Sequence, residues 1–326
     1  MASRVLRVIG VAVAVILALE AGLRVFGDRL DQPLEWYHSA AQQSVADMDR
    51  LHDAGMTSDV VFVGTSMIRE DIQIPIIEDQ LSSIDRASNV ALPAAQTSVM
   101  REWLLDQVIP RLHPGRVVWG VESIDFNGGR SVPVVERYDT GRAVRGGVLG
   151  SADRVLSATF ALSRHRAQLR NPSFVVDFFR ARPNEATTPL EDLLSPVNEG
   201  RRANDKKNKK EFGRIRDDAL GGFVIGDREV ADFEYTIEAL RSQGIEVVVV
   251  LMPVPNGYVR AHPNGNDDFA NFQEWLHGEA ARLGVALIDH ARTMPSDAFI
   301  DYTHLASAGA LEFSQILAAD LDSLGW

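Results

Sequence analysis

The apolar positions of this chain fall into two kinds of segment that follow one another from about residue 59 onward. Short continuous runs rich in valine and isoleucine are typical of strands buried on both faces of a sheet. Longer segments with apolar residues every three or four positions are typical of amphipathic helices. Their alternation predicts an α/β fold with a parallel sheet. The predicted strands are Val60–Val63, Ala87–Ala91, Val117–Val121, Ile245–Leu251 and Val285–Ile288.

The segments between these strands predict the helices that flank the sheet. Two of them end at Gly244 and Gly284, and a predicted strand follows each glycine directly. Glycine readily adopts the left-handed conformation in which many helices end, so both helix ends are well defined by sequence. The predicted helices are Gln96–Ile109, Glu229–Gln243, Asp268–Leu283 and a closing helix, Leu305–Leu321.

An apolar segment opens the chain. Arg4 and Arg7 precede an uncharged run over residues 8–19. A helix over residues 5–26 would measure about 33 Å at about 1.5 Å per residue, which is enough to span a bilayer. Arginines ahead of the run place the N-terminus in the cytoplasm and the remainder of the chain outside, as a single-pass plasma-membrane protein.

The residues after the apolar run favour an uncleaved anchor over residues 1–28. Leu19-Glu20-Ala21 is a poor site for signal peptidase. Glu20 and Arg24 lie one helical turn apart and can pair near a membrane interface. A cleaved signal peptide and a soluble amphipathic helix are the alternatives.

Beyond the anchor we expect a connecting segment over residues 29–58 and a catalytic domain over 59–326. The strand–helix alternation stops between about residues 127 and 228, which predicts a mainly helical insertion serving as a lid or docking subdomain. Six of the ten residues from Arg201 to Lys210 are basic. This run is either a solvated loop or a contact for anionic headgroups, an anionic polymer or a partner protein.

Composition removes several classes of function. The net charge of −12 argues against a nucleic-acid partner. The chain has no cysteine, and therefore neither a disulfide nor a cysteine nucleophile. The few histidines lack metal-ligand spacing and no glycine-rich phosphate loop is present, so we expect no metal and no cofactor.

The first predicted strand leads directly into Gly64-Thr65-Ser66-Met67. This arrangement presents a small hydroxyl side chain at the end of a buried strand, where it needs a base to become a nucleophile. Asp301-Tyr302-Thr303-His304, just before the closing helix, supplies one. His304 can take the proton of Ser66, while Asp301, three residues earlier, holds the imidazole in one tautomer.

These two segments resemble the first and last sequence blocks of the SGNH (GDSL-type) hydrolase superfamily. The family's Gly-Asp-Ser-Leu stands here as Gly64-Thr65-Ser66-Met67, and its Asp-x-x-His matches Asp301 and His304. The resemblance implies a flavodoxin-like α/β sheet and acyl transfer through an acyl-serine. The motif differs from the Gly-x-Ser-x-Gly of α/β-hydrolases because Ile68 stands at the second glycine.

Acyl transfer also needs hydrogen-bond donors for the oxyanion. The backbone N–H of Ser66, at the start of a predicted helix, is one candidate. The resemblance implies further donors from the family's second and third blocks, where this sequence departs from the pattern. Ala94 or Ala95 stands where a glycine is expected, and Ser123 or Asn127 would substitute for the asparagine of a missing Gly-x-Asn-Asp.

Together these features predict a membrane-anchored, extracytoplasmic serine acyltransferase or esterase that acts on an envelope glycan or lipid-linked glycan. The plan of anchor, SGNH domain and insertion resembles the alginate O-acetylation and D-alanyl-lipoteichoic acid biosynthesis proteins. Expected partners are a glycan or acylated small molecule, the membrane, and a membrane-bound acyltransferase. The alternatives are a simple tethered carbohydrate esterase or lipase and a non-catalytic accessory subunit of an acyltransferase complex.

Overall fold

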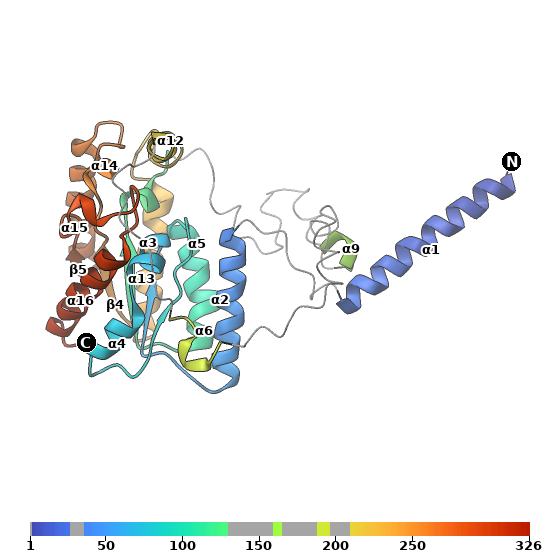
Figure 1. Cartoon of the computed structure of the whole chain (residues 1–326), viewed down its shortest axis with the longest axis horizontal. Helices are drawn as coiled ribbons and strands as arrows, with labels where there is room; N and C mark the ends of the chain where they lie inside the picture. Colours follow the sequence, from blue (N-terminus) through green and yellow to red (C-terminus); the bar gives the residue numbers. More distant parts are fainter. Residues whose placement is uncertain (1, 27–35, 130–158, 165–187, 196–208) are drawn as a thin grey trace. The chain divides into compact units, whose positions relative to one another are not determined.

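The computed structural model describes residues 2–26, 36–129, 159–164, 188–195 and 209–326. These residues belong to two compact units, one formed by Met1–Ser39 and Glu136–Thr187 and the other by Ala40–Val135 and Thr188–Trp326 (Figure 1). Most of the predicted insertion, and the basic run up to residue 208, lie outside the described residues.

The larger unit is built on a five-stranded sheet in which every neighbouring pair is parallel, as predicted. The strand order β2-β1-β3-β4-β5 is that of flavodoxin-like doubly wound folds. In this order the chain leaves β1 toward β2 and returns to β3 on the other side, so the carboxyl ends of β1 and β3 form the topological switch point at which such folds bind ligands. The strands are β1 Val60–Val63, β2 Ala87–Asn89, β3 Arg116–Val121, β4 Glu246–Leu251 and β5 Ala286–Asp289.

Helices cover the sheet in two groups (Figure 1). One group packs α16 against α3 and α4, and the other packs α13 against α5. Right-handed crossovers place the two groups on opposite faces. The main helices of this unit are α2 Trp36–Asp53, α3 Ser66–Asp71, α4 Ile74–Gln80, α5 Thr97–Glu102, α13 Asp227–Ser242, α14 Asn256–Val259, α15 Asn266–Leu283 and α16 Ser307–Ser323. Shorter helical segments are η3 Ser123–Phe126, η4 Leu190–Asp192, α12 Lys209–Arg214, η5 Ile215–Ala219 and η6 Ser296–Ala298.

Two predicted helix ends are found where the glycines stand. Gly244 and Gly284 have φ angles of 77° and 63°, the left-handed conformation that ends a helix. The predicted helix Gln96–Ile109 instead continues through a π-helical segment, η2 Trp103–Val108, into α6 Ile109–Leu112. Pro110 explains the widened turn, because proline lacks the N–H for an α-helical bond and its ring crowds the carbonyl four residues back.

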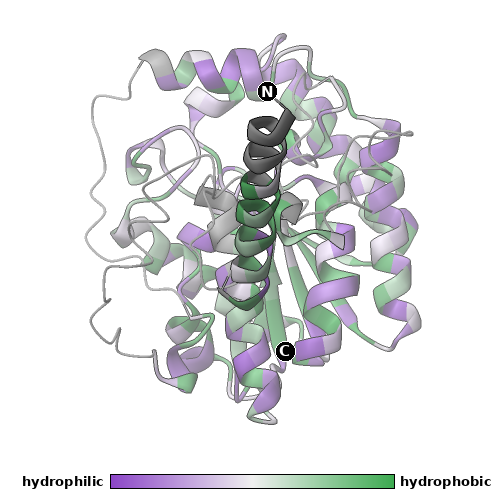
Figure 2. Ribbon diagram, turned by 90° about the vertical axis from the view of Figure 1, so that its right-hand side faces the viewer, coloured by the Kyte–Doolittle hydropathy of each residue, from purple (hydrophilic) through white to green (hydrophobic). Residues whose placement is uncertain are grey.

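The core of this unit lies between the strands and the apolar faces of the helices (Figure 2). All four residues of β1 are fully buried. Phe126, in η3, packs its ring against Phe233 of α13 and Trp275 of α15, with centroids 5.2 and 4.9 Å away. These contacts fix the segment that directly follows β3.

The smaller unit contains α1 Ala2–Phe26 and α9 Ala161–Arg164. Glu20 accepts hydrogen bonds from the backbone N–H groups of Ala161 and Leu162 at 2.9 Å each and pairs with Arg24 at 2.9 Å. None of the helices in the described part of the chain is long and apolar enough to cross a membrane. The side chains of residues 1–9, including both predicted flanking arginines, lie outside the described set.

Candidate active site

Ser66 lies at the carboxyl end of β1 as the first residue of α3. The turn before it requires glycine: Gly64 has a φ of 153°, and a Cβ there would approach the carbonyl oxygen of Gly120 to 2.5 Å. Thr65 is the N-cap, and its hydroxyl accepts a hydrogen bond from the N–H of Met67 at 3.3 Å. The local sequence therefore ends the strand and starts the helix at a partly exposed serine.

His304 and Asp301 meet Ser66 at this edge of the sheet. The Nε2 of His304 lies 2.8 Å from the Oγ of Ser66, and its Nδ1 lies 2.7 Å from the Oδ2 of Asp301. A proton on Nδ1 leaves Nε2 as the acceptor, which is the tautomer that a general base for Ser66 needs. The structure thus brings together the three residues that the two sequence motifs predict.

The loop that carries the pair is held by its own hydrogen bonds. The Oδ1 of Asp301 accepts from the N–H groups of Thr303 and His304 at 2.8 and 2.7 Å. Burial raises the pKa of Asp301, but the hydrogen bonds and charge of His304, with these N–H groups, outweigh it and lower the pKa to about 2. Asp71 of α3 accepts from the N–H of Leu305 at 2.9 Å and so ties this loop to the helix that begins at Ser66.

The predicted donor segment after β2 also lies beside the turn that precedes Ser66, because the N–H of Leu92 donates to the carbonyl of Gly64 at 2.9 Å. Ala94 has a φ of 59°, a conformation that favours glycine and explains why a glycine is expected there. The N–H of Ala95 donates to the carbonyl of Leu92 at 3.3 Å. Of the two alanines, Ala94 is therefore the better candidate donor.

Ser123 and Asn127 are not placed as oxyanion donors, which corrects the prediction for both. Ser123 is fully buried, with its Oγ 2.8 Å from the hydroxyl of Tyr258 and 2.9 Å from the Nε2 of His262. Asn127 is 1% exposed and donates to the carbonyl of Ala219 at 2.8 Å. Its Oδ1 accepts two N–H groups, so this side chain joins the two ends of the insertion.

The buried Ser123 cluster has a defined hydrogen-bond direction. Burial lowers the pKa of His262, so its imidazole is neutral, and Nδ1 donates to the carbonyl of Val259 at 3.2 Å. Burial and the charge of Glu122 raise the pKa of Tyr258, so its phenol stays protonated. Ser123 therefore donates to His262 and accepts from Tyr258. The cluster ties α14 to the end of β3.

Glu122 is a residue of this region that the sequence analysis did not identify. It follows β3 directly, is 4% exposed, and its Oε1 accepts from the hydroxyl of Thr65 at 3.0 Å. Its backbone N–H donates to the Oδ2 of Asp125 at 2.9 Å. The available signal was its position, since a carboxylate at the end of a buried strand next to the nucleophile's strand needs a hydrogen-bond partner.

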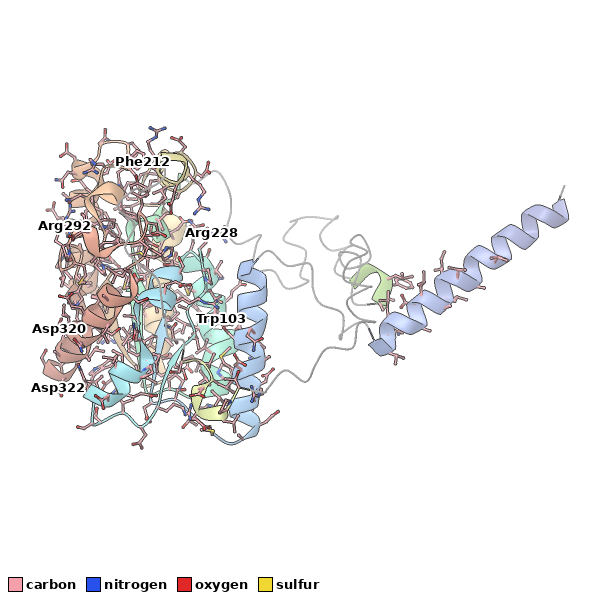
Figure 3. The ribbon with its side chains drawn as sticks, viewed as in Figure 1. Trp103, Phe212, Arg228, Arg292, Asp320 and Asp322 are labelled. Atoms are coloured by element: carbon pink, nitrogen blue, oxygen red, sulfur yellow. The ribbon has the colours of Figure 1, made fainter. Side chains whose placement is uncertain are left out.

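The insertion returns to the site at α12. The ring of Phe212, labelled in Figure 3, lies 5.3 Å from the ring of Tyr302, the residue that follows Asp301 in the sequence. The ring of Tyr302 also packs on Gly257, where a Cβ would come within 2.6 Å of it. One member of this aromatic pair therefore belongs to the loop that carries Asp301 and His304.

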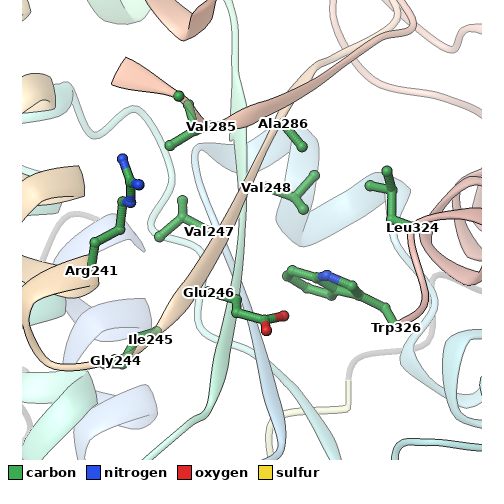
Figure 4. Close-up of a pocket in the computed structure, with 11 residues that line it drawn as sticks. Arg241, Gly244, Ile245, Glu246, Val247, Val248, Val285, Ala286, Leu324 and Trp326 are labelled. Carbon is green, nitrogen blue, oxygen red and sulfur yellow. The ribbon is translucent and has the colours of Figure 1, made fainter. Parts of the chain in front are cut away.

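A cavity of about 420 Å³ lies at the opposite edge of the sheet (Figure 4). It is lined by the first residues of β4 and β5, Glu246, Val247 and Ala286, together with Trp326. Ser66 and His304 follow the carboxyl ends of the strands, so this cavity is separate from the candidate active site.

No family model and no curated protein matches the sequence. Solved structures that resemble the chain include an acetyl xylan esterase, a carbohydrate acetylesterase from Sinorhizobium meliloti and an inhibitor-bound aryl esterase from M. Smegmatis. Each is 11% identical and covers 81% of this chain and 98% of its own, with TM-scores of 0.43, 0.38 and 0.37. At this level of identity and TM-score the likenesses decide neither the reaction nor the substrate.

Proposed function

We propose that the protein is a serine esterase or acyltransferase that forms an acyl-enzyme on Ser66. The observation that carries this proposal is the continuous chain of contacts from Ser66 Oγ to His304 Nε2 at 2.8 Å and from His304 Nδ1 to Asp301 at 2.7 Å. A partly exposed serine with an oriented base is the arrangement that nucleophilic acyl transfer needs.

In the proposed reaction the Oγ of Ser66 attacks the carbonyl carbon of an ester while His304 accepts its proton. Asp301 stabilises the resulting imidazolium. The N–H of Ser66, which has no acceptor within the first turn of α3, and the N–H of Ala94 stabilise the oxyanion. His304 then gives the proton to the leaving alcohol, which departs and leaves an acyl-serine. In the second half, His304 deprotonates water or a sugar hydroxyl that takes the acyl group and restores Ser66.

The proposed substrate is an acylated glycan of the cell envelope or a lipid-linked glycan. The plan of anchor, SGNH-like blocks and insertion, which resembles the alginate O-acetylation proteins, supports an ester of a sugar. The aromatic pair of Phe212 and Tyr302 beside the catalytic loop supplies an apolar surface suited to the face of a sugar ring.

The proposed location is the outer side of the plasma membrane, with residues 1–28 as the anchor. The apolar run behind Arg4 and Arg7 supports it. Membrane fractionation with N-terminal sequencing tests the anchor: we expect an intact chain in the membrane fraction. A soluble chain that begins near Gly22 would contradict it.

The catalytic proposal is tested by hydrolysis of p-nitrophenyl acetate, with and without sugar acceptors. We expect turnover by the wild type and none above background by Ser66→Ala. Ser123→Ala is the matched control, because Ser123 also contacts a histidine but is fully buried. Transfer of acetate to the sugar identifies an acyltransferase, and release to water alone an esterase. Equal turnover by wild type and Ser66→Ala would refute both.

A further inference from the structure

The hydroxyl of Thr65 lies between the start of α3 and the end of β3. It accepts from the N–H of Met67 at 3.3 Å and donates to the Oε1 of Glu122 at 3.0 Å. Because its own proton is committed to Glu122, a lone pair of the oxygen is directed at Met67. Both Thr65 and Glu122 are 4% exposed, so water does not substitute readily for either bond.

Glu122 is itself held in place by its own neighbours. Its side chain and that of Asp125 form reciprocal hydrogen bonds with each other's backbone N–H groups, a capping box at the start of η3. The next residue, Ser123, is fixed by Tyr258 and His262. β3 is also the hydrogen-bonded neighbour of β1. The carboxylate of Glu122 is therefore held in one position. Its hydrogen bond to Thr65 fixes the turn before Ser66 relative to β3.

We propose that Glu122 is a positioning residue for Ser66 and acts through the hydroxyl of Thr65. By orienting Thr65 it makes α3 begin at Ser66, which keeps the serine Oγ in line with His304 and its N–H free for the oxyanion. This inference rests on the proposed role of Ser66. Glu122 has no direct part in the chemistry, because its contact is to the residue before the nucleophile.

The contact is tested with variants that remove or preserve each hydrogen bond. Thr65→Val and Glu122→Leu each remove it with little change of shape. We expect kcat on p-nitrophenyl acetate to fall about 10²-fold in both, the cost of a displaced reacting group, with KM unchanged. Thr65→Ser keeps the hydroxyl and Glu122→Gln keeps an acceptor oxygen, so both should retain most of kcat.

The double variant, Thr65→Val with Glu122→Leu, separates positioning from general damage. Because the two residues act as one unit, its kcat should fall no further than that of either single variant. Rates are expressed per active site, counted by titration with a serine-directed phosphonate, and the fraction folded is checked by thermal unfolding. Inactive protein that merely fails to fold lowers the number of sites, not the rate at each.

An unchanged rate per site in Thr65→Val, or losses that multiply in the double variant, would overturn the inference. If Glu122→Leu fails to fold, the comparison of Thr65→Val with Thr65→Ser still tests the same hydrogen bond, because it changes the donor and leaves Glu122 in place. Different results would refute the proposed function itself: turnover retained by Ser66→Ala, or no phosphonate label on Ser66.

Discussion

Replacing Asp301 with asparagine tests the contact that orients His304 in two independent ways. The folded protein lowers the pKa of Asp301 from 3.8 to about 2. A lowered carboxyl pKa stabilises the folded state above the unfolded pKa, and this stabilisation is lost as the pH falls toward the folded pKa. The shift corresponds to about 2 kcal/mol, of which about 1 kcal/mol is lost between pH 5 and pH 3.

The assay is urea unfolding of the full chain at pH 5 and pH 3, for the wild type and Asp301→Asn. The wild type should lose about 1 kcal/mol more than the variant over this interval, since asparagine does not titrate. Asp267→Asn, at an exposed position of α15, is the matched control and should behave as the wild type. Equal losses in wild type and Asp301→Asn would refute the ion pair.

The same variant has a kinetic signature. Asparagine can present its NH₂ group to Nδ1 and so stabilise the wrong imidazole tautomer. In the well-studied triads of this geometry the change lowers kcat by about 10⁴-fold. We expect a loss of that order on p-nitrophenyl acetate at neutral pH, where Asp301 is ionised. Retention of most of kcat would show that Asp301 does not orient His304.

Three further variants test features outside the triad. Ala94→Gly relieves a left-handed alanine and should raise the free energy of unfolding by about 1 kcal/mol with turnover retained, because only the N–H of this residue is assigned a role. Asn127→Ala should lower that free energy by about 1–3 kcal/mol through its lost hydrogen bonds yet leave kcat near wild type; a loss of about 10²-fold or more in kcat would restore Asn127 as an oxyanion donor. The chain has no cysteine, so Leu23→Cys with Leu162→Cys introduces a single possible disulfide between α1 and α9. If Glu20 holds α9 against α1, this disulfide should form on oxidation, and its yield should be lower when Glu20→Ala is added. An equal yield with and without Glu20→Ala would contradict that role of Glu20.

Local patterns were sufficient for much of the larger unit. The β1 strand was predicted with its observed bounds, and two helix ends were predicted from glycines. These features depend on neighbours in sequence, namely a buried run before a turn and a residue that tolerates positive φ. The π-helical segment before Pro110 was not predicted, because the apolar period continues through it and only the missing N–H of Pro110 marks the change.

The site was predictable only as far as its motifs are local. Ser66 and the Asp301–His304 pair follow strands whose carboxyl ends meet at one edge, so their meeting followed from fold class. Ser123 and Asn127 were assigned wrongly, because their side chains are oriented by residues far along the chain, such as His262 and Ala219. Sequence shows that a polar residue follows a strand but not which partner its side chain meets.

Glu122 was missed for a related reason. A carboxylate cannot donate a hydrogen bond to an oxyanion, and the relevance of Glu122 comes from its contact with Thr65, which only the pairing of β1 with β3 brings about. The Glu20 contact with α9 likewise joins residues more than a hundred positions apart. Within α1 alone, the sequence showed only the Glu20–Arg24 pair.

The most direct test of the central claim is labelling by a serine-directed phosphonate, read by intact mass and peptide mapping. We expect one adduct per chain of wild-type protein, located on Ser66. Ser66→Ala should take up none, His304→Ala should react far more slowly because no base removes the serine proton, and Ser123→Ala should label as the wild type. A wild-type chain that takes up no phosphonate, or carries it on another serine, would contradict the account.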